Sequence, residues 1–128
     1  HEALRGLDVG PPIIGGKERA DSVRAGLQAV REGVVLVHDA ARPFCPPEVV
    51  DRLLAALDHA DGAVPVLPVA DTLAKGDSEI RGTVNRTQML RVQTPQAFHA
   101  EDLLFALDEA GSSAATDEST VLFNAGLR

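Results

Sequence analysis

The sequence has few aromatic side chains and a deficit of positive charge. It contains no Trp or Tyr and only four Phe among 128 residues, so platforms on which nucleic-acid bases could stack are scarce. Twelve Lys and Arg against nineteen Asp and Glu give a net charge of -7. This balance argues against a nucleic-acid polymer bound through a broad basic surface. A small anionic ligand is not excluded, because a few local cations and backbone amides suffice to hold one.

The sequence also has a single cysteine and no long apolar run. The single Cys45 cannot form an internal disulfide, which fits a reducing cytosol. No apolar run approaches the length of about 20 residues that a membrane-spanning helix needs, and the first residues, HEALRG, do not resemble a signal peptide. We therefore expect a cytoplasmic protein that has no membrane partner.

What the sequence does contain is an alternation of short apolar strands and amphipathic helices. Apolar periodicity predicts helices over residues 20–33, 46–62, 100–111 and 116–126. Apolar runs predict strands at residues 11–16, 34–38, 63–69 and 89–95. The run at 34–38 is continuously apolar, which is typical of a strand covered on both faces. This order favours an α/β fold with a mostly parallel sheet flanked by helices. A Gly-Asp turn predicts a hairpin arm at about 71–86.

The stretch LVHDAARPF places Asp39 and Arg42 where the strand at 34–38 ends. In open α/β sheets, ligands bind outside the carboxyl ends of strands. A carboxylate there accepts from a sugar hydroxyl or approaches a metal, and an arginine grips a phosphate through two parallel hydrogen bonds. The alternative interpretation is a solvated Asp–Arg pair that closes a loop. The spacing leaves both interpretations open.

A second polar stretch, GGKERADSVRAGL, leads into the first predicted helix. Gly15 and Gly16 let the backbone come close to a ligand, and the amino end of a helix attracts anions. Asp21 or Ser22 could equally be a simple helix cap. The stretch matches neither the P-loop nor the dinucleotide fingerprint. The local sequence patterns therefore predict an α/β domain with a site for a phosphate ligand, and they do not identify the ligand further.

Six motifs in one order add a family resemblance. GGKERADSV is followed by LVHDAARPF, DTLAK, TVNR, QTPQAF and TDES. In this order they resemble the 2-C-methyl-D-erythritol 4-phosphate cytidylyltransferases of non-mevalonate isoprenoid biosynthesis, from about Ile13 to the end of the chain. The resemblance implies a nucleotidyltransferase (Rossmann-like) fold with a protruding β-arm that builds a homodimer. It also implies transfer of a cytidylyl group from CTP to methylerythritol phosphate, with release of pyrophosphate and with Mg²⁺ held mainly by the CTP phosphates.

The resemblance implies nucleotide-binding roles for residues in the first two motifs. Gly16 is expected against the cytosine, and Ser22 is expected to hold the nucleotide from the helix start. Asp39 and Ala40 are expected at the ribose, with Asp39 also close to the substrate and the metal-bound phosphates.

The substrate roles that the resemblance implies are spread over the later motifs. Arg42, Thr94 and Thr116 are expected to contact methylerythritol phosphate. Thr72 and Arg86 are expected to reach the partner subunit's site from the arm, where Arg86 positions the substrate phosphate for attack on the α-phosphorus of CTP. Thr94 is equally interpretable as a strand end, and Thr116 as a helix N-cap.

His38 is not expected to be a catalytic base. The attacking phosphate is already anionic, so the reaction needs cations and fixed orientation more than proton removal. A histidine at the end of a buried strand is more typical of a hydrogen-bonded structural residue. TVNR also departs from the family, which often has aspartate where this sequence has Asn85.

The resemblance leaves two segments of the family without a counterpart in the 128 residues: an amino-terminal glycine-rich segment and a carboxyl-terminal segment with a substrate-phosphate lysine. We expect residues 1–128 to be the central part of a single cytidylyltransferase domain, incomplete at both ends and nearly inactive alone. Three alternatives stay open at this point. They are a ribitol 5-phosphate cytidylyltransferase, half of a bifunctional protein, and a noncatalytic nucleotide-binding or dimerisation fragment.

Overall fold

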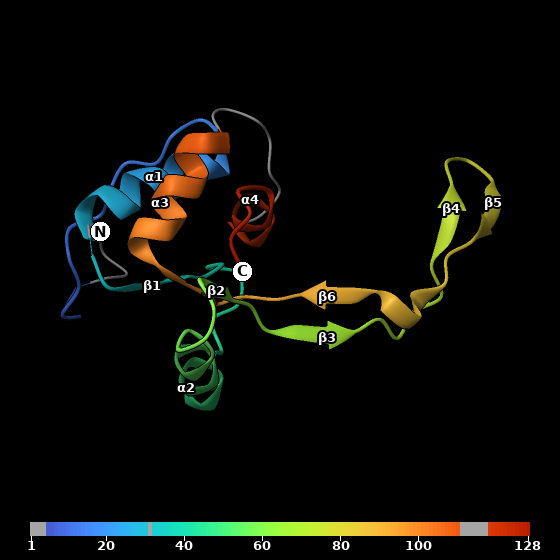
Figure 1. Cartoon of the computed structure of the whole chain (residues 1–128), viewed down its shortest axis with the longest axis horizontal. Coiled ribbons are helices and arrows are strands. Elements are labelled where there is room, and N and C mark those ends of the chain that lie inside the picture. Colours follow the sequence, from blue (N-terminus) through green and yellow to red (C-terminus); the bar gives the residue numbers. More distant parts are fainter. Residues whose placement is uncertain (1–4, 31, 111–117) are drawn as a thin grey trace.

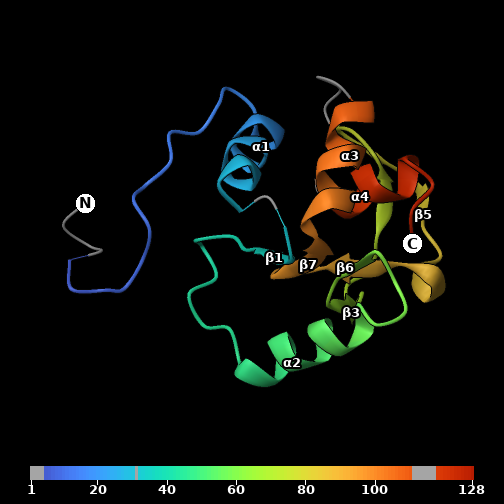
Figure 2. The ribbon, with the colours of Figure 1, turned by 60° about the vertical axis from the view of Figure 1, so that its left-hand side comes forward.

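A three-stranded sheet with helices on both faces forms the body of the computed structural model, which describes residues 5–30, 32–110 and 118–128. The strand order is β1 (Val34–Val37), β7 (Gln96–His99), β2 (Gly62–Ala63). One face carries α1 (Arg19–Val30), α3 (Ala100–Ala110) and α4 (Glu118–Asn124), and the other carries α2 (Pro47–Ala56) (Figures 1 and 2). The α/β fold is as predicted.

The orientation of the strands differs from the prediction of a mostly parallel sheet. β1 and β2 each pair antiparallel with β7, and every strand pairing in the described ranges is antiparallel. β1 and β2 therefore run parallel to each other, as strand–helix–strand order requires, but they are not neighbours. The reason is that β7 returns from the arm and enters the sheet between them.

The arm consists of two antiparallel ribbons in succession. β3 (Val66–Pro68) pairs with β6 (Leu90–Val92), and farther out β4 (Ala74–Gly76) pairs with β5 (Ile80–Thr83). A short 3-10 helix, η2 (Arg86–Gln88), joins β5 to β6. The hairpin predicted at about 71–86 is thus confirmed by β4 and β5, and Figure 1 shows it projecting away from the helices.

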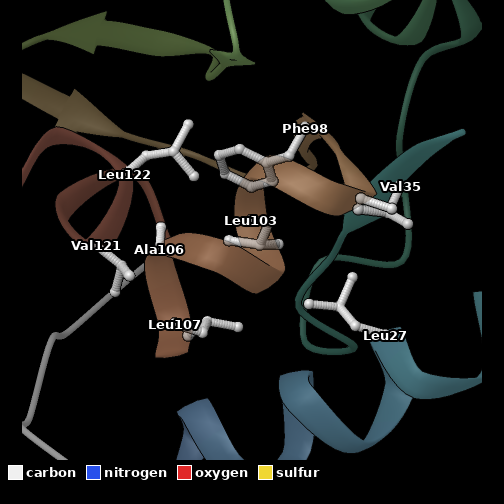
Figure 3. Close-up of a cluster of buried hydrophobic side chains, with 9 residues drawn as sticks. Leu27, Val35, Phe98, Leu103, Ala106, Leu107, Val121 and Leu122 are labelled. Atoms are coloured by element: carbon white, nitrogen blue, oxygen red, sulfur yellow. The ribbon is translucent and has the colours of Figure 1, made fainter. Parts of the chain in front are cut away.

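Two apolar clusters hold the helices onto the sheet. Successive side chains of a strand point to opposite faces, so Phe98 and Ala97 of β7 serve different clusters. Phe98 packs in the larger cluster, which also holds Leu103 of α3 and Leu122 of α4 (Figure 3). Ala97 packs on the other face against Leu53. β7 is therefore packed on both faces, and its pairing with β1 positions the end of β1.

The helical predictions agree with the structure better than the strand predictions do. The four predicted helices correspond to α1, α2, α3 and the described part of α4. The strand predicted at residues 11–16 is wrong, because that segment has no strand pairing, and its two prolines lack an N–H to donate. Among the described residues, β1 is covered on one face only, since Val34 and Leu36 remain exposed. β7 was not predicted.

In the part of the chain that the structure describes, no helix is long and apolar enough to cross a membrane.

Gly62 of β2 is required by the packing of β7 on α4. A Cβ at this position would lie 2.7 Å from Cδ1 of Phe98 and 2.9 Å from Cδ2 of Leu122, and both side chains are buried. We expect Gly62→Ala to lower the free energy of unfolding by about 1–3 kcal/mol, as overpacking of a core does. The matched control is Gly26→Ala, where nothing lies within 4 Å of the added Cβ and helix propensity favours alanine. Urea unfolding that ranks Gly62→Ala as the more stable of the two variants would contradict the packing described.

Candidate functional site

Asp39 and Arg42 are the two ends of a tight turn that follows β1. The N–H of Arg42 donates to the carbonyl oxygen of Asp39 over 2.9 Å, and Ala40 with Ala41 forms the exposed middle of the turn. This closes a β-turn with aspartate at its first position, where aspartate is favoured. Nε of Arg42 lies 3.5 Å from Oδ2 of Asp39. Both side chains remain about two-fifths exposed, so they are accessible to a ligand.

A chain of hydrogen bonds fixes this turn onto the start of β7. The backbone N–H of Asp39 donates to Oγ1 of Thr94 over 3.2 Å. Oγ1 of Thr94 lies 3.0 Å from Nδ1 of His38, and Nε2 of His38 lies 2.7 Å from the carbonyl oxygen of Arg42. A carbonyl only accepts, so Nε2 carries the proton and, in neutral His38, Nδ1 accepts from the Thr94 hydroxyl. Both ring nitrogens of His38 are therefore hydrogen-bonded, and its absence from the catalytic step stays a prediction.

Arg42 has a second partner besides Asp39. Its Nη1 donates to Oε1 of Gln93, which precedes Thr94 at the end of the arm ribbon. The guanidinium is thus held between the turn and the chain that enters β7. An arginine fixed in this way presents its remaining donors in a set direction, which suits recognition of a phosphate.

Arg19 at the start of α1 is a site residue that the sequence prediction missed. Its Nη2 lies 3.7 Å from Oδ1 of Asp39, and its Nη1 donates to Oε1 of Glu118. The Glu118 side chain is 2% exposed. The hydrogen bond to Glu118 raises the pKa of Arg19 above its usual value, although burial partly opposes this effect and the Glu118 and Asp39 charges add to it. Arg19 therefore stays protonated throughout the pH range of a folded protein.

The loop before α1 brings Gly16 and Ser22 together. The N–H of Gly16 donates to Oγ of Ser22 over 3.1 Å, and that hydroxyl donates to the carbonyl oxygen of Glu18. A Cβ on Gly16 would lie 2.2 Å from Cβ of Asp21. Close packing of the loop on the helix therefore requires glycine here. This requirement holds with or without a bound base, so the nucleotide roles of Gly16 and Ser22 stay predictions.

Thr72 and Arg86 lie on the arm and are not brought to the turn within one subunit. Thr72 is exposed just before β4. Arg86 opens η2, at the far end of the β3–β6 ribbon from the sheet (Figure 1), and its Nη1 donates to the carbonyl oxygen of Ala70. Asn85 caps η2, because its Oδ1 accepts from the N–H of Thr87 over 3.0 Å. Aspartate caps helices equally well, so Asn85 preserves this local structure.

Two further features complete the surroundings of the turn. A cavity of about 560 Å³ lies between α2 and β3 and reaches Gln93 and Thr94. Its other walls are mostly apolar, and the lining residues include Phe44, Val49, Leu53 and Val66, so it does not suit a polyphosphate.

Within residues 5–30, 32–110 and 118–128, no group of three or more His, Cys, Asp or Glu side chains could hold a metal ion. Thr116 lies outside the described residues.

The site residues that were missed belong to motifs visible in the sequence. Arg19 stands within GGKERADSV and Glu118 within TDES. No local pattern signals that two residues so far apart in sequence form an ion pair. The nearest that the sequence comes to a signal is an arginine shortly before the predicted cap, Asp21 or Ser22, together with an acidic residue before a distant apolar run.

Comparison with known proteins shows the family of this chain. The family model described as 2-C-methyl-D-erythritol 4-phosphate cytidylyltransferase matches residues 7–128. A protein named bifunctional enzyme IspD/IspF from Rhizorhabdus wittichii is 59% identical over 105 residues, which is 82% of this chain and 28% of that protein. A protein of the same name from Granulibacter bethesdensis is 48% identical over 127 residues, covering 96% of this chain and 34% of that protein.

Solved structures agree with the sequence comparisons. The 2-C-methyl-D-erythritol 4-phosphate cytidylyltransferase from Thermus thermophilus matches with a TM-score of 0.84 and 36% identity, over 95% of this chain and 65% of that one. The bifunctional IspDF from Campylobacter jejuni matches with a TM-score of 0.85 and 31% identity, over 99% of this chain and 33% of that one. This chain thus spans about a third of the length of the curated relatives it matches. It belongs to the 2-C-methyl-D-erythritol 4-phosphate cytidylyltransferase family.

Proposed function

We propose that the protein containing this chain transfers a cytidylyl group from CTP to 2-C-methyl-D-erythritol 4-phosphate, in non-mevalonate isoprenoid biosynthesis. A phosphate oxygen of the methylerythritol phosphate attacks the α-phosphorus of CTP. The bond from that phosphorus to the bridging oxygen breaks, and pyrophosphate leaves with the electron pair. The observation that carries the proposal is the Asp39–Arg42 turn, which presents a carboxylate and a fixed guanidinium at the carboxyl end of β1.

The main task of such a site is to bring two polyanions together. Arg42 donates its free N–H groups to the substrate phosphate, and its contact with Gln93 fixes the direction of those groups. Asp39 accepts from hydroxyls of the ribose or the polyol, and its carboxylate lies between Arg19 and Arg42. Thr94 orients this turn and approaches the same substrate. No side chain of the site is needed as a general base.

The residues present fit a magnesium ion that is bound mainly by the nucleotide. Asp39 is the carboxylate of the turn, and it has an arginine 3.7 Å or less from each of its oxygens. A complete cage of protein ligands is therefore not built around it, and at most Asp39 would complement phosphate oxygens as a ligand. Bound to CTP, the ion would supply charge neutralisation at the phosphates.

The arm supports the proposal of a homodimer. In the β3–β6 ribbon, Val66 lies opposite Val92 and Pro68 opposite Leu90. Because side chains alternate along a strand, these four share one face of the ribbon, and Val66, Val92 and Leu90 are exposed in this chain. An isolated two-stranded ribbon is marginally stable in water. Packing of this apolar face on a second copy, in a closed two-fold dimer, would carry Thr72 and Arg86 to the partner subunit's site.

An assay of the complete protein tests the proposed function. With CTP and magnesium, we expect release of pyrophosphate when 2-C-methyl-D-erythritol 4-phosphate is supplied, and much slower release with ribitol 5-phosphate. A clear preference for ribitol 5-phosphate would instead identify the rival activity. No release with either polyol phosphate would favour a noncatalytic nucleotide-binding role. The family description favours the first outcome.

Thr94 gives a separate prediction for the turn. Thr94→Val removes the hydroxyl that accepts from Asp39 and contacts His38, so the turn loses two of its hydrogen bonds to the segment that leads into β7. We expect kcat/KM to fall by up to about 100-fold, the effect of misplacing a reacting group. Thr94→Ser keeps the hydroxyl and is the matched control, expected to retain most of the activity. Equal kinetics of the valine and serine variants would show that the hydroxyl has no role.

A further inference from the structure

Arg19 is positioned between a buried carboxylate and an accessible one. Nη1 donates to Oε1 of Glu118, and Nη2 faces Oδ1 of Asp39 at 3.7 Å. The Glu118 side chain is 2% exposed and that of Asp39 is 40% exposed. A planar guanidinium can donate to two acceptors in fixed directions. Arg19 therefore connects the interior of the protein to the turn at the end of β1.

Glu118 is suited to act as the fixed end of this connection. It opens α4, whose Val121 and Leu122 are buried in the larger apolar cluster. Its second oxygen, Oε2, has no hydrogen-bond partner within the described parts of the chain. Without Arg19 the buried carboxylate would lose its charge partner, and an unpaired buried charge is strongly unfavourable. Arg19 is thus held in place from the Glu118 side.

The two oxygens of Asp39 face different arginines. Oδ1 faces Arg19 and Oδ2 lies 3.5 Å from Nε of Arg42. Asp39 is therefore attracted from both sides, by Arg19 at one oxygen and by Arg42 at the other. If Arg19 were not anchored, Asp39 could turn toward Arg42 alone and form a bidentate pair, which would occupy donors that a phosphate needs.

We infer that Glu118 is a positioning residue, which acts through Arg19 to hold Asp39 so that the Arg42 guanidinium stays available to the substrate phosphate. This inference rests on the proposed function, because it concerns the same site. Glu118 itself does not touch the substrate in this arrangement. Its effect passes entirely through the Arg19–Asp39 contact, and that dependence makes the inference testable.

The competing explanation is that the Arg19–Glu118 pair only ties α1 to α4. Arg24, which lies on α1 like Arg19, offers a control for that explanation. Nε of Arg24 lies 3.4 Å from Oδ1 of Asp108, and its Nη2 donates to the carbonyl oxygen of Leu107. Arg24 therefore ties α1 to α3 through an arginine–carboxylate pair whose Asp108 side chain is 64% exposed, and no contact joins it to Asp39 within the described residues. If the pairs of Arg19 and Arg24 are both purely structural, breaking either one should lower the melting temperature and leave kcat and KM unchanged.

The test is a double-mutant cycle in the complete protein, with CTP and 2-C-methyl-D-erythritol 4-phosphate as substrates. We expect Glu118→Gln to lower kcat/KM by at least about 10-fold, within the range that misplacement of a reacting group produces, mainly by raising KM for the polyol phosphate. Arg24→Gln should lower the melting temperature without changing KM. In an Asp39→Asn background, Glu118→Gln should have no further effect on kcat/KM, because the charge that Arg19 positions is gone.

A second variant keeps the test decisive if Glu118→Gln does not fold. The double variant Arg19→Gln/Glu118→Gln leaves two neutral amides that can hydrogen-bond to each other and no unpaired buried charge. It should fold and show the same rise in KM. Wild-type kinetics in a folded variant, or an equal loss in the Asp39→Asn background, would overturn the inference while leaving the proposed function intact. An inactive wild-type protein would instead remove the proposed function, and the inference with it.

Discussion

Arg42→Lys in the complete protein is expected to lower kcat/KM for 2-C-methyl-D-erythritol 4-phosphate by about 100-fold, a loss comparable to that of one oriented donor in a charged transition state. The positive charge is kept, but its geometry is not. Arg42 contacts Asp39 through Nε and Gln93 through Nη1, and this leaves one edge of the guanidinium for a ligand. A lysine ammonium is a point charge on a flexible stem and cannot satisfy these partners together. Initial rates at saturating CTP measure the effect.

The control for Arg42→Lys is Arg52→Lys. Arg52 lies on α2, and its Nε donates to the carbonyl oxygen of Glu48 in its own helix. Its replacement should leave the kinetics unchanged. If Arg42→Lys and Arg52→Lys behaved alike, with both at wild-type rates, the Asp39–Arg42 pair would be a solvated surface pair and no part of a phosphate site.

Arg86→Ala is the second change with a large expected effect, a fall in kcat of about 100- to 1,000-fold. In the proposed dimer, Arg86 positions the substrate phosphate in the partner subunit's site. Within its own subunit it donates to the carbonyl oxygen of Ala70, so it is already oriented by the base of the hairpin. The matched control is Arg81→Ala on the same arm. Its pair with Asp77 is 2.9 Å long and well exposed, and exposed pairs contribute little.

These two variants must be compared in the same oligomeric state. Size-exclusion chromatography should give the same dimer for the wild type, Arg86→Ala and Arg81→Ala. A loss of activity in Arg86→Ala that accompanies dissociation would assign the residue to assembly. A loss that leaves the dimer intact would assign it to the reaction, as we expect.

The local parts of this structure could be predicted from the sequence. Apolar periodicity found α1 and α2, and the Gly-Asp turn found the β4–β5 hairpin. The Asp39–Arg42 turn was not predicted, although aspartate is favoured at the first position of a turn and proline restricts the residue before it. Such features depend on side chains a few positions apart, which a sequence pattern records directly.

The non-local parts could not be predicted in this way. β7 is four residues long and lies between a proline and α3, so it offers no periodicity. Its place between β1 and β2 depends on contacts such as Val35 opposite Phe98, which local propensity does not specify. The Arg19–Glu118 pair joins residues 99 positions apart. Sequence patterns indicated the motifs that build the site, whereas the contacts between the motifs required the structure.

The most direct test of the central claim, a strand-end site completed by the partner subunit's arm, is subunit mixing in the complete protein. Arg86→Ala subunits are mixed with Asp39→Ala subunits under conditions that allow exchange. In a mixed dimer one site carries both defects, while the other keeps its own Asp39 and receives an intact Arg86 from its neighbour. Activity should rise above that of either parent, toward about half the wild-type rate per exchanged dimer by this counting of sites. Verified exchange without any gain in activity would contradict the claim.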